Sequence, residues 1–210
     1  MLCRSPEAGY GISRPGATRP IWEMSVSTLC RSFGWSLAVV ACLAAGCALL
    51  RGPQAPTAEA LHARQLMVPV AGVSPQQVPD NFRAPRGWGA GIHGAVDILA
   101  PRGTRVLSAD AGRVLRLHRN RKGGLTIYAT DETERFVYYY AHLSAYGHGI
   151  IQGTHLARGQ VIGFVGTTGN ADRREPHLHF QVMVRPRGGR WWKSEPIDPR
   201  PFFVSTGRAR

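Results

Sequence analysis

The stretch Glu175–Val184 reads EPHLHFQVMV, and its alternation of residue types is typical of a β-strand. Successive side chains of a strand point to opposite faces, so His177 and His179 project to one side, while Leu178 and Phe180 project to the other. The apolar side then faces a core, and the two imidazoles lie beside each other on the open side. Such a pair suits a metal site or an acid–base site, because a purely structural pair brings two like charges together on protonation.

Outward from this stretch, the chain from about Asn81 consists of short runs rich in Val, Ile, Tyr and Phe, separated by glycine-rich or polar turns. The runs are Thr104–Ala109, Gly112–His118, Leu125–Thr130, Phe136–His142, Gln160–Val165 and Leu178–Val184. Breaks such as Lys122-Gly123-Gly124 and Thr168-Gly169-Asn170 separate them. The sequence lacks the long helical periodicities that a βαβ fold needs. It therefore predicts an all-β fold, a single antiparallel β domain built like a sandwich or barrel.

A second histidine motif, His93-Gly94-Ala95-Val96-Asp97, lies in the run GIHGAVDILAPRGT. A His and an Asp four residues apart share one face of a helix, but the surrounding glycines and Val96 favour a loop that enters a strand. Taken alone, so short a pattern favours a surface histidine and a turn aspartate.

A third motif, Tyr138-Tyr139-Tyr140-Ala141-His142-Leu143, lies in an aromatic-rich run. Strict alternation predicts that Tyr138, Tyr140 and His142 share one face of the strand. Taken alone, an aromatic strand that ends in His is more typical of packing than of catalysis. The histidines outside the three motifs are expected at the surface: His62, His118, His148 and His155.

The N-terminal quarter of the chain predicts export. From Met24, a second candidate start beside Met1, a short polar stretch leads into the apolar run FGWSLAVVACLAAGCALL at Phe33–Leu50. The end of that run, Leu43-Ala44-Ala45-Gly46-Cys47, resembles a bacterial lipoprotein signal, in which the Cys is acylated, although Ala44 stands where Leu is usual. An uncleaved membrane anchor and full secretion are the alternatives, and each places the bulk of the protein outside the cytoplasm.

Composition divides the chain into four parts. Residues 1–50 are an N-terminal extension with the export signal or membrane anchor, and residues 51–80, rich in Pro, Ala and Gln, are expected to form a linker with a short helix around Ala58–Gln65. Residues 81–203 form the globular domain, and residues 204–210 a basic tail. All four cysteines precede the linker, so a metal site in the globular part must use His and carboxylate ligands. The cysteines are Cys3, Cys30, Cys42 and Cys47.

The formal net charge of +13 favours a polyanionic partner: nucleic acid, anionic lipid or a wall polymer that carries carboxylates. The sequence contains no basic motif interleaved with aromatic residues and no Cys/His finger spacing, so nucleic acid is not the expected partner.

The three histidine motifs occur together in the order of the lysostaphin/LytM family of zinc metallopeptidases, and the chain resembles that family from about Asp80 to Phe203. The surrounding stretches APRGTRV, ADAGRV and ARGQVIGFVGTTGNA match as well. The resemblance implies that His93, Asp97 and His179 bind Zn²⁺, which leaves a position open for water, and that His142 and His177 are catalytic. The charged segment Ala171–Glu175 departs from the small residues and Thr usual there, which puts substrate choice in doubt.

The resemblance further implies a zinc-dependent endopeptidase of the cell envelope that hydrolyses peptide cross-links of peptidoglycan. The alternative is a catalytically inactive regulator of other wall hydrolases, since some family members have lost ligands. All five residues are present here, which favours the enzyme. The resemblance does not choose between glycine bridges and D-amino-acid cross-links as substrate, or divide the roles of His142 and His177.

Overall fold

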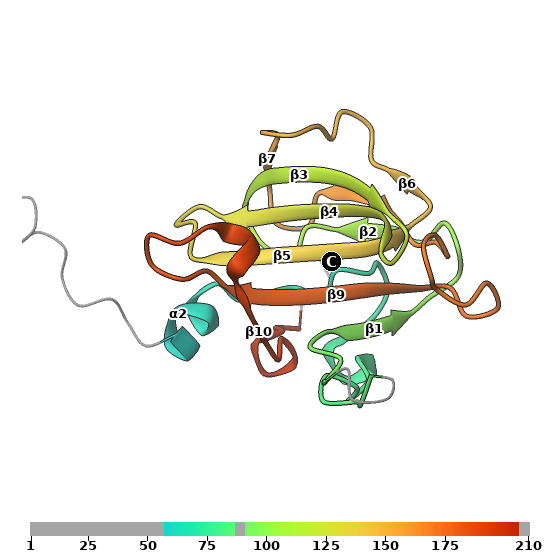
Figure 1. The fold of residues 1–210 in the computed structure, drawn as a ribbon, viewed down its shortest axis with the longest axis horizontal. Coiled ribbons are helices and arrows are strands. Elements are labelled where there is room, and N and C mark those ends of the chain that lie inside the picture. The colour runs from blue at the N-terminus through green and yellow to red at the C-terminus, as the bar shows by residue number, and fades with distance from the viewer. Residues whose placement is uncertain (1–56, 87–90, 206–210) are drawn as a thin grey trace, which may run out of the picture. The chain divides into compact units, whose positions relative to one another are not determined.

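The computed structural model describes residues 57–86 and 91–205, which form two antiparallel β-sheets around a shared core (Figure 1). The larger sheet contains β1 (Val96–Leu99), β3 (Gly112–Asn120), β4 (Gly124–Asp131), β5 (Phe136–Leu143), β7 (His155–Leu156), β9 (His177–Val184) and β10 (Glu195–Ile197). The smaller sheet contains β2 (Arg105–Leu107), β6 (Ala145–Tyr146) and β8 (Val161–Phe164). The predicted all-β antiparallel fold is confirmed, and each run predicted as a strand overlaps one.

Strand β9 organises the larger sheet, whose order is β1-β9-β5-β4-β3-β7, with β10 paired to the second half of β9. Strand β1 pairs with the first half of β9, so that Asp97 lies opposite His179. On the other side of β9, Ala141 of β5 also lies opposite His179. The register therefore brings the three histidine motifs to the same end of the sheet.

One face of the larger sheet is buried against the rest of the domain. Leu178 and Phe180 of β9 are fully buried and belong to the same hydrophobic cluster as Val106 and Ile162 of the smaller sheet. The smaller sheet lies behind the larger one in Figure 1. The alternation of EPHLHFQVMV therefore works as the sequence predicts: its apolar residues enter the core and its histidines remain on the other face.

Residues 57–80 differ from the expected linker. The short helix predicted there is α2 (Thr57–Ala63), a 3₁₀ helix, η1, spans Pro75–Gln77, and the segment contributes five buried side chains to the core. These are Leu61, Leu66, Val68, Val70 and Val78. Isolated bridges pair Leu66 with Phe203 and Val70 with Val106. The high Pro and Gln content led to the prediction of a linker. Apolar residues nevertheless alternate at positions 66, 68 and 70, and this alternation allows the segment to pack as a strand does.

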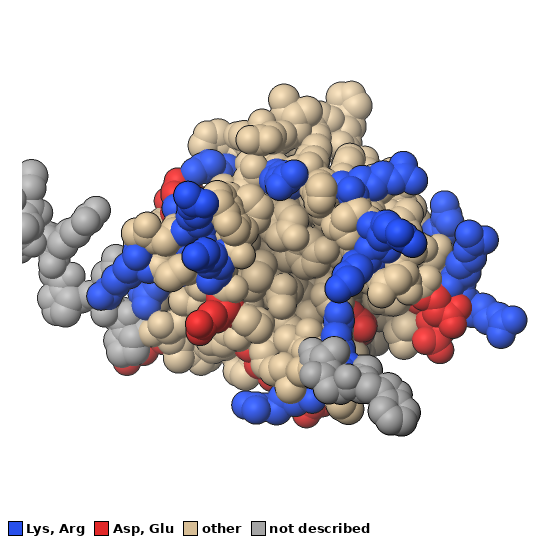
Figure 2. All heavy atoms as spheres, viewed as in Figure 1, with Lys and Arg blue, Asp and Glu red and all other residues tan. Residues whose placement is uncertain are grey.

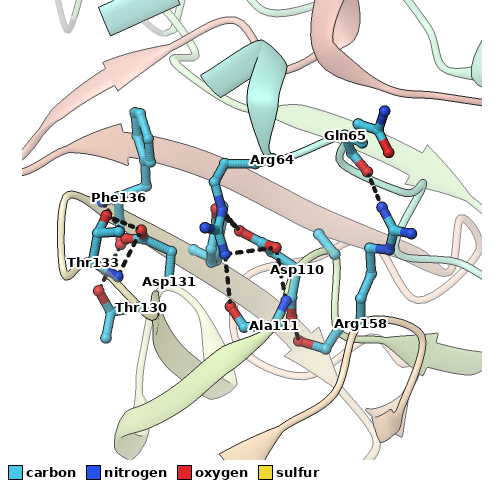
Figure 3. Close-up of polar contacts among 12 residues, drawn as sticks. Arg64, Gln65, Asp110, Ala111, Thr130, Asp131, Thr133, Phe136 and Arg158 are labelled. Carbon is cyan, nitrogen blue, oxygen red and sulfur yellow. Dashed lines mark hydrogen bonds and ion pairs between the residues drawn. The ribbon is translucent and has the colours of Figure 1, made fainter. Parts of the chain in front are cut away.

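Polar contacts join the two residues after α2, Arg64 and Gln65, to the rest of the domain (Figure 3). The Arg64 guanidinium forms an ion pair with Asp110, with Nε 2.6 Å from Oδ2, and the Tyr138 hydroxyl donates to the same carboxylate over 2.7 Å. Arg158 donates to the Gln65 carbonyl over 2.8 Å. Asp110 is buried, and these donors offset the cost of removing its polar side chain from water.

Several sequence predictions lie outside the described residues. They are the export signal or anchor in residues 1–50 with Cys47, the first part of the linker, and most of the basic tail. Within residues 57–86 and 91–205, no helix is long and apolar enough to cross a membrane.

Candidate functional site

Three side chains, from two neighbouring strands and the loop that precedes one of them, converge on one point of the exposed sheet face. Asp97 lies on β1, His179 lies on β9, and His93 lies in the loop that precedes β1. Nδ1 of His179 lies 2.7 Å from an Asp97 carboxylate oxygen, and Nε2 of His93 lies 3.1 Å from both His179 Nδ1 and the other Asp97 oxygen. One donor atom from each residue lies within 4.8 Å of the others, which is close enough for one metal ion to bind all three.

The backbone before β1 orients this group. The Asn81 carbonyl accepts from Nδ1 of His93 over 3.0 Å, so that Nε2 carries the lone pair and faces Asp97 and His179. The Asn81 side-chain oxygen accepts from the Asp97 backbone N–H. Burial by itself raises the pKa of Asp97, but the interactions of its carboxylate with the neighbouring His179 and His93 rings outweigh it and hold that pKa well below its usual value. The carboxylate is therefore ionised, as a metal ligand must be.

Two further histidines face this group. The ring of His142 lies 5.0 Å from the ring of His177 and 5.7 Å from that of His179, centroid to centroid. Nδ1 of His142 donates to the Thr168 carbonyl over 2.8 Å, and Nδ1 of His177 donates to the Glu175 carbonyl over 2.8 Å. In both rings, Nε2 is therefore left free to accept or return a proton. Burial lowers the pKa of His142 to about 4, which keeps that ring neutral near pH 7.

His142 does not lie on the face that strict alternation predicts. Tyr138 and Tyr140 point into the core, whereas His142 is on the opposite, site face. The β4–β5 register shifts between Leu125 and Ile127, and His142 has a φ of 61°. This irregularity is a β-bulge, which inserts one extra residue and turns the following side chain to the other face. The prediction that His142 shares a face with Tyr138 and Tyr140 was wrong, because a residue period of two in the sequence does not reveal a β-bulge.

Two glycine turns hold the bulge in place. A Cβ on Gly169 would lie 2.3 Å from the Gly124 nitrogen and 2.3 Å from the Lys122 carbonyl oxygen, so the two turns are in direct backbone contact. The turn at Lys122–Gly124 supplies the Gly123 carbonyl, which accepts a hydrogen bond from the His142 backbone N–H over 2.8 Å. The turn at Thr168–Asn170 supplies the Thr168 carbonyl, which accepts from the His142 ring. Both stretches were predicted only as breaks between strands, yet together they fix the His142 backbone and ring.

The five side chains line a single cleft of about 410 Å³, which therefore holds every site residue that the sequence predicts on the globular domain. Sequence reasoning missed other residues of its lining, among them Arg86, Lys122, Tyr139 and Gln181. Nη2 of Arg86 lies 3.4 Å from His179 Nδ1, and the Tyr139 ring lies 6.0 Å from the His179 ring. For Tyr139 and Gln181 the sequence did contain a signal: the side-chain period of two along β5 and β9 places both on the same sheet face as His179. This face is hollowed, and Lys and Arg side chains surround the hollow (Figure 2).

Comparison with known proteins now identifies the chain. The profile of Peptidase family M23 matches residues 91–199, just over half of the chain and the part that contains all five side chains. The chain belongs to Peptidase family M23. Family M23 is a zinc peptidase family, and the donor set of two imidazoles and one carboxylate is one that zinc accepts.

Relatives in family M23 resemble this chain over its globular part. Lysostaphin of Staphylococcus staphylolyticus is 34% identical over 59% of this chain and 24% of its own length. The L-Ala–D-Glu endopeptidase of Bacillus subtilis (strain 168) is 37% identical over 53% of this chain and 35% of its own length. The chain thus spans between about a quarter and a third of these relatives.

Several solved structures share the fold. Helicobacter pylori Csd3 is 28% identical, with a TM-score of 0.52 over 67% of this chain and 35% of that chain. LytU is 26% identical, with a TM-score of 0.51 over 62% of this chain and 84% of that chain. A zinc-containing peptidase from Vibrio cholerae is 25% identical, with a TM-score of 0.51 over 65% of this chain and 40% of that chain.

Proposed function

We propose that this protein is a zinc-dependent endopeptidase that hydrolyses peptide cross-links of bacterial peptidoglycan. One observation carries the proposal: a group of two histidines and one aspartate shares a cleft with two more histidines, whose Nδ1 atoms donate to backbone carbonyls. A metal site that served structure alone would be closed by a fourth protein ligand. Here only three donors from described residues form the group, and the cleft is open to solvent.

We assign His93, Asp97 and His179 as the zinc ligands. The donor atoms are His93 Nε2, His179 Nδ1 and an Asp97 carboxylate oxygen, since these are the atoms that face one another. When bound, zinc supplies a Lewis acid and a coordinated water whose pKa falls to about 7. The hydrogen bond from His93 to the Asn81 carbonyl supports the assignment, because ligand histidines usually donate their second ring nitrogen to a fixed acceptor.

We assign His142 and His177 as the acid–base pair. A neutral ring whose Nδ1 is held by a carbonyl presents Nε2 as a proton acceptor, and the protonated ring returns that proton from the same atom. In peptide hydrolysis, one proton leaves the attacking water and one reaches the departing amine. The two rings are 5.0 Å apart and line the same cleft, so the pair is placed to do both.

The identity of the substrate rests on relatives and on charge. Relatives in the family are named as an L-Ala–D-Glu endopeptidase, a glycyl-glycine endopeptidase and a DD-carboxypeptidase/endopeptidase, and such bonds belong to peptidoglycan stems and bridges. Next to the cleft, Arg102, Arg119 and Arg173 line a second hollow together with Thr167 and Thr168. None of these three arginines forms an ion pair with another described residue, so they suit the free carboxylates of the wall polymer.

Digestion of purified walls tests the proposal. The chain without its first 50 residues is incubated with walls of different cross-link types, and mass spectrometry identifies the new amino and carboxyl termini. We expect new peptide termini that disappear with chelator and return with Zn²⁺. If the wild type binds zinc but cuts no wall type, an inactive regulator of other wall hydrolases replaces the enzyme.

For the whole chain, we propose export and attachment to the membrane through Cys47, with a peptidase domain that begins near Thr57. The apolar run before Cys47 supports this placement, as does a substrate outside the cytoplasm. Metabolic labelling with a fatty acid should mark the wild type and leave Cys47→Ser unlabelled. An unlabelled wild type that stays in the membrane fraction would replace the lipid with an uncleaved apolar anchor, and one in the soluble fraction would indicate secretion.

A further inference from the structure

Another hollow, of about 330 Å³ and distinct from the one lined by Arg102, Arg119 and Arg173, extends the cleft along the same face of the larger sheet. Gln181 of β9 lines both, so the hollow continues the cleft rather than forming a separate pocket. Aromatic and planar polar side chains dominate its lining. We call it the tryptophan shelf and define it by Arg116, Asn120, Tyr128, Gln181, Trp191 and Trp192.

The connection between β9 and β10 builds one wall of the tryptophan shelf. It forms the 3₁₀ helix η2 (Trp191–Lys193), the red coil that lies in front of β4 and β5 in Figure 1. The Trp191 ring lies 5.0 Å from the Tyr128 ring and is perpendicular to the Trp192 ring at 5.5 Å. Trp192 remains 60% exposed, with the Arg190 guanidinium 5.3 Å from its ring centre. A large aromatic side chain held at the surface beside a cleft is typical of a binding surface.

A continuous row of rings joins the shelf to the metal group. The Tyr139 ring lies 6.0 Å from His179 and 4.6 Å from Tyr128, which in turn contacts Trp191. Cross-strand register produces this row, because Gln181 lies opposite Tyr139, and Tyr139 lies opposite Tyr128. A ligand longer than the scissile bond can therefore occupy the cleft and the shelf together.

The chemistry of the lining selects a kind of ligand. Aromatic faces pack against the C–H groups of a flat ring, while guanidinium and amide groups form hydrogen bonds with its edge. No Asp or Glu lines the shelf. A pyranose ring with an acetamido group fits this combination, since it presents C–H groups on its face, and hydroxyl and amide groups around its rim.

We propose that the tryptophan shelf binds an N-acetylated amino sugar of the glycan strand that carries the cleaved peptide. This inference rests on the proposed function, since a wall peptide in the cleft is attached to such a strand. An extended peptide spans about 3.3–3.6 Å per residue, so a stem of a few residues crosses the row of rings between the metal group and Trp191. The shelf would let the enzyme recognise strand-attached peptides.

The test compares one cross-linked peptide with and without its glycan. Polymeric peptidoglycan is one substrate, and the same cross-linked peptides released by an amidase are the other. Trp192→Ala should raise KM on the glycan-bearing substrate about 5- to 20-fold, with kcat and the rate on free peptides close to wild type. Ile151→Ala is the matched control, because Ile151 is 66% exposed, close to the 60% of Trp192, and lines neither the cleft nor the tryptophan shelf; it should match the wild type on both substrates.

A binding measurement keeps this inference separate from the proposed activity. Tryptophan fluorescence of the full chain is titrated with peptide-free glycan strands, and we expect a saturable change that Trp192→Ala weakens at least about 5-fold. This result supports the shelf even if no wall type is cut. Equal losses on glycan-bearing and free peptides would assign the shelf to the peptide and overturn the sugar. An absence of glycan binding by the wild type would overturn it as well.

Discussion

The Thr168 carbonyl accepts a hydrogen bond from Nδ1 of His142 over 2.8 Å, and this contact determines which ring nitrogen faces the cleft. Thr168 belongs to a turn whose next residue, Gly169, is pressed against Gly124. The position of a proposed catalytic nitrogen thus depends on the packing of two glycines, neither of which carries a side chain.

Gly169→Ala should lower stability and activity together. Its φ of 79° and its backbone contacts at 2.3 Å add steric overlap to the cost of a left-handed conformation, about 2–4 kcal/mol in total. Gly153→Ala is the matched control, because Gly153 has a φ of 87° and no atom within 4 Å of an added Cβ; it should cost about 1–2 kcal/mol and leave turnover unchanged. Urea unfolding and hydrolysis rates measure both. Equal effects at the two positions would contradict the role of the glycine contact.

Metal content should separate the two kinds of histidine. His93→Ala and His179→Ala should lose zinc and activity together, and so should Asp97→Ala, since each removes a proposed ligand. His177→Ala and His142→Asn should keep zinc close to stoichiometric while turnover falls roughly 10²- to 10⁴-fold. Asn is chosen at position 142 because it tolerates the left-handed backbone there. Elemental analysis measures the zinc content of each variant, and hydrolysis rates are measured beside it. Complete loss of zinc in His177→Ala or His142→Asn would refute the division between ligands and acid–base residues.

The zinc-free protein should lose stability as the pH falls from about 6.5 toward 4. Burial lowers the pKa of His142 from 6.5 to about 4, and it also lowers that of His179. Between these values the unfolded chain binds more protons than the folded one, so their contribution to stability is complete above about pH 6.5 and declines below it. Urea unfolding at several pH values should show a shallower decline for His142→Asn. Parallel curves for variant and wild type would show that His142 is not buried as described.

Arg64→Ala should destabilise the protein by about 2–4 kcal/mol, because it leaves the buried Asp110 carboxylate without its cationic partner. Arg113→Ala removes an Arg from a solvent-exposed ion pair with Glu134 and should cost no more than about 1 kcal/mol. Thermal or urea unfolding compares the two. A loss for Arg64→Ala as small as for Arg113→Ala would mean that residues 57–80 do not pack on the domain as the structure has them.

The sequence predicted what depends on local period and failed where distant segments determine the geometry. The alternation around His177 and His179 predicted both the strand and the face of each side chain, because one buried face dictates that pattern. The face of His142 required knowledge of a bulge that two distant glycine turns create. The missed packing of residues 57–80 is a similar case, since Leu66 pairs with Phe203, which lies near the other end of the domain in the sequence.

Under the proposed attachment through Cys47, the packing of residues 57–80 also limits how far the cleft can reach from the membrane. A free segment from Cys47 to Asn81 would let the cleft explore on the order of 100 Å from its attachment point, at about 3.3–3.6 Å per residue. With the domain beginning at Thr57, only nine residues separate it from Cys47, a reach of about 35 Å at most. An enzyme attached there would trim only the wall layer nearest its membrane.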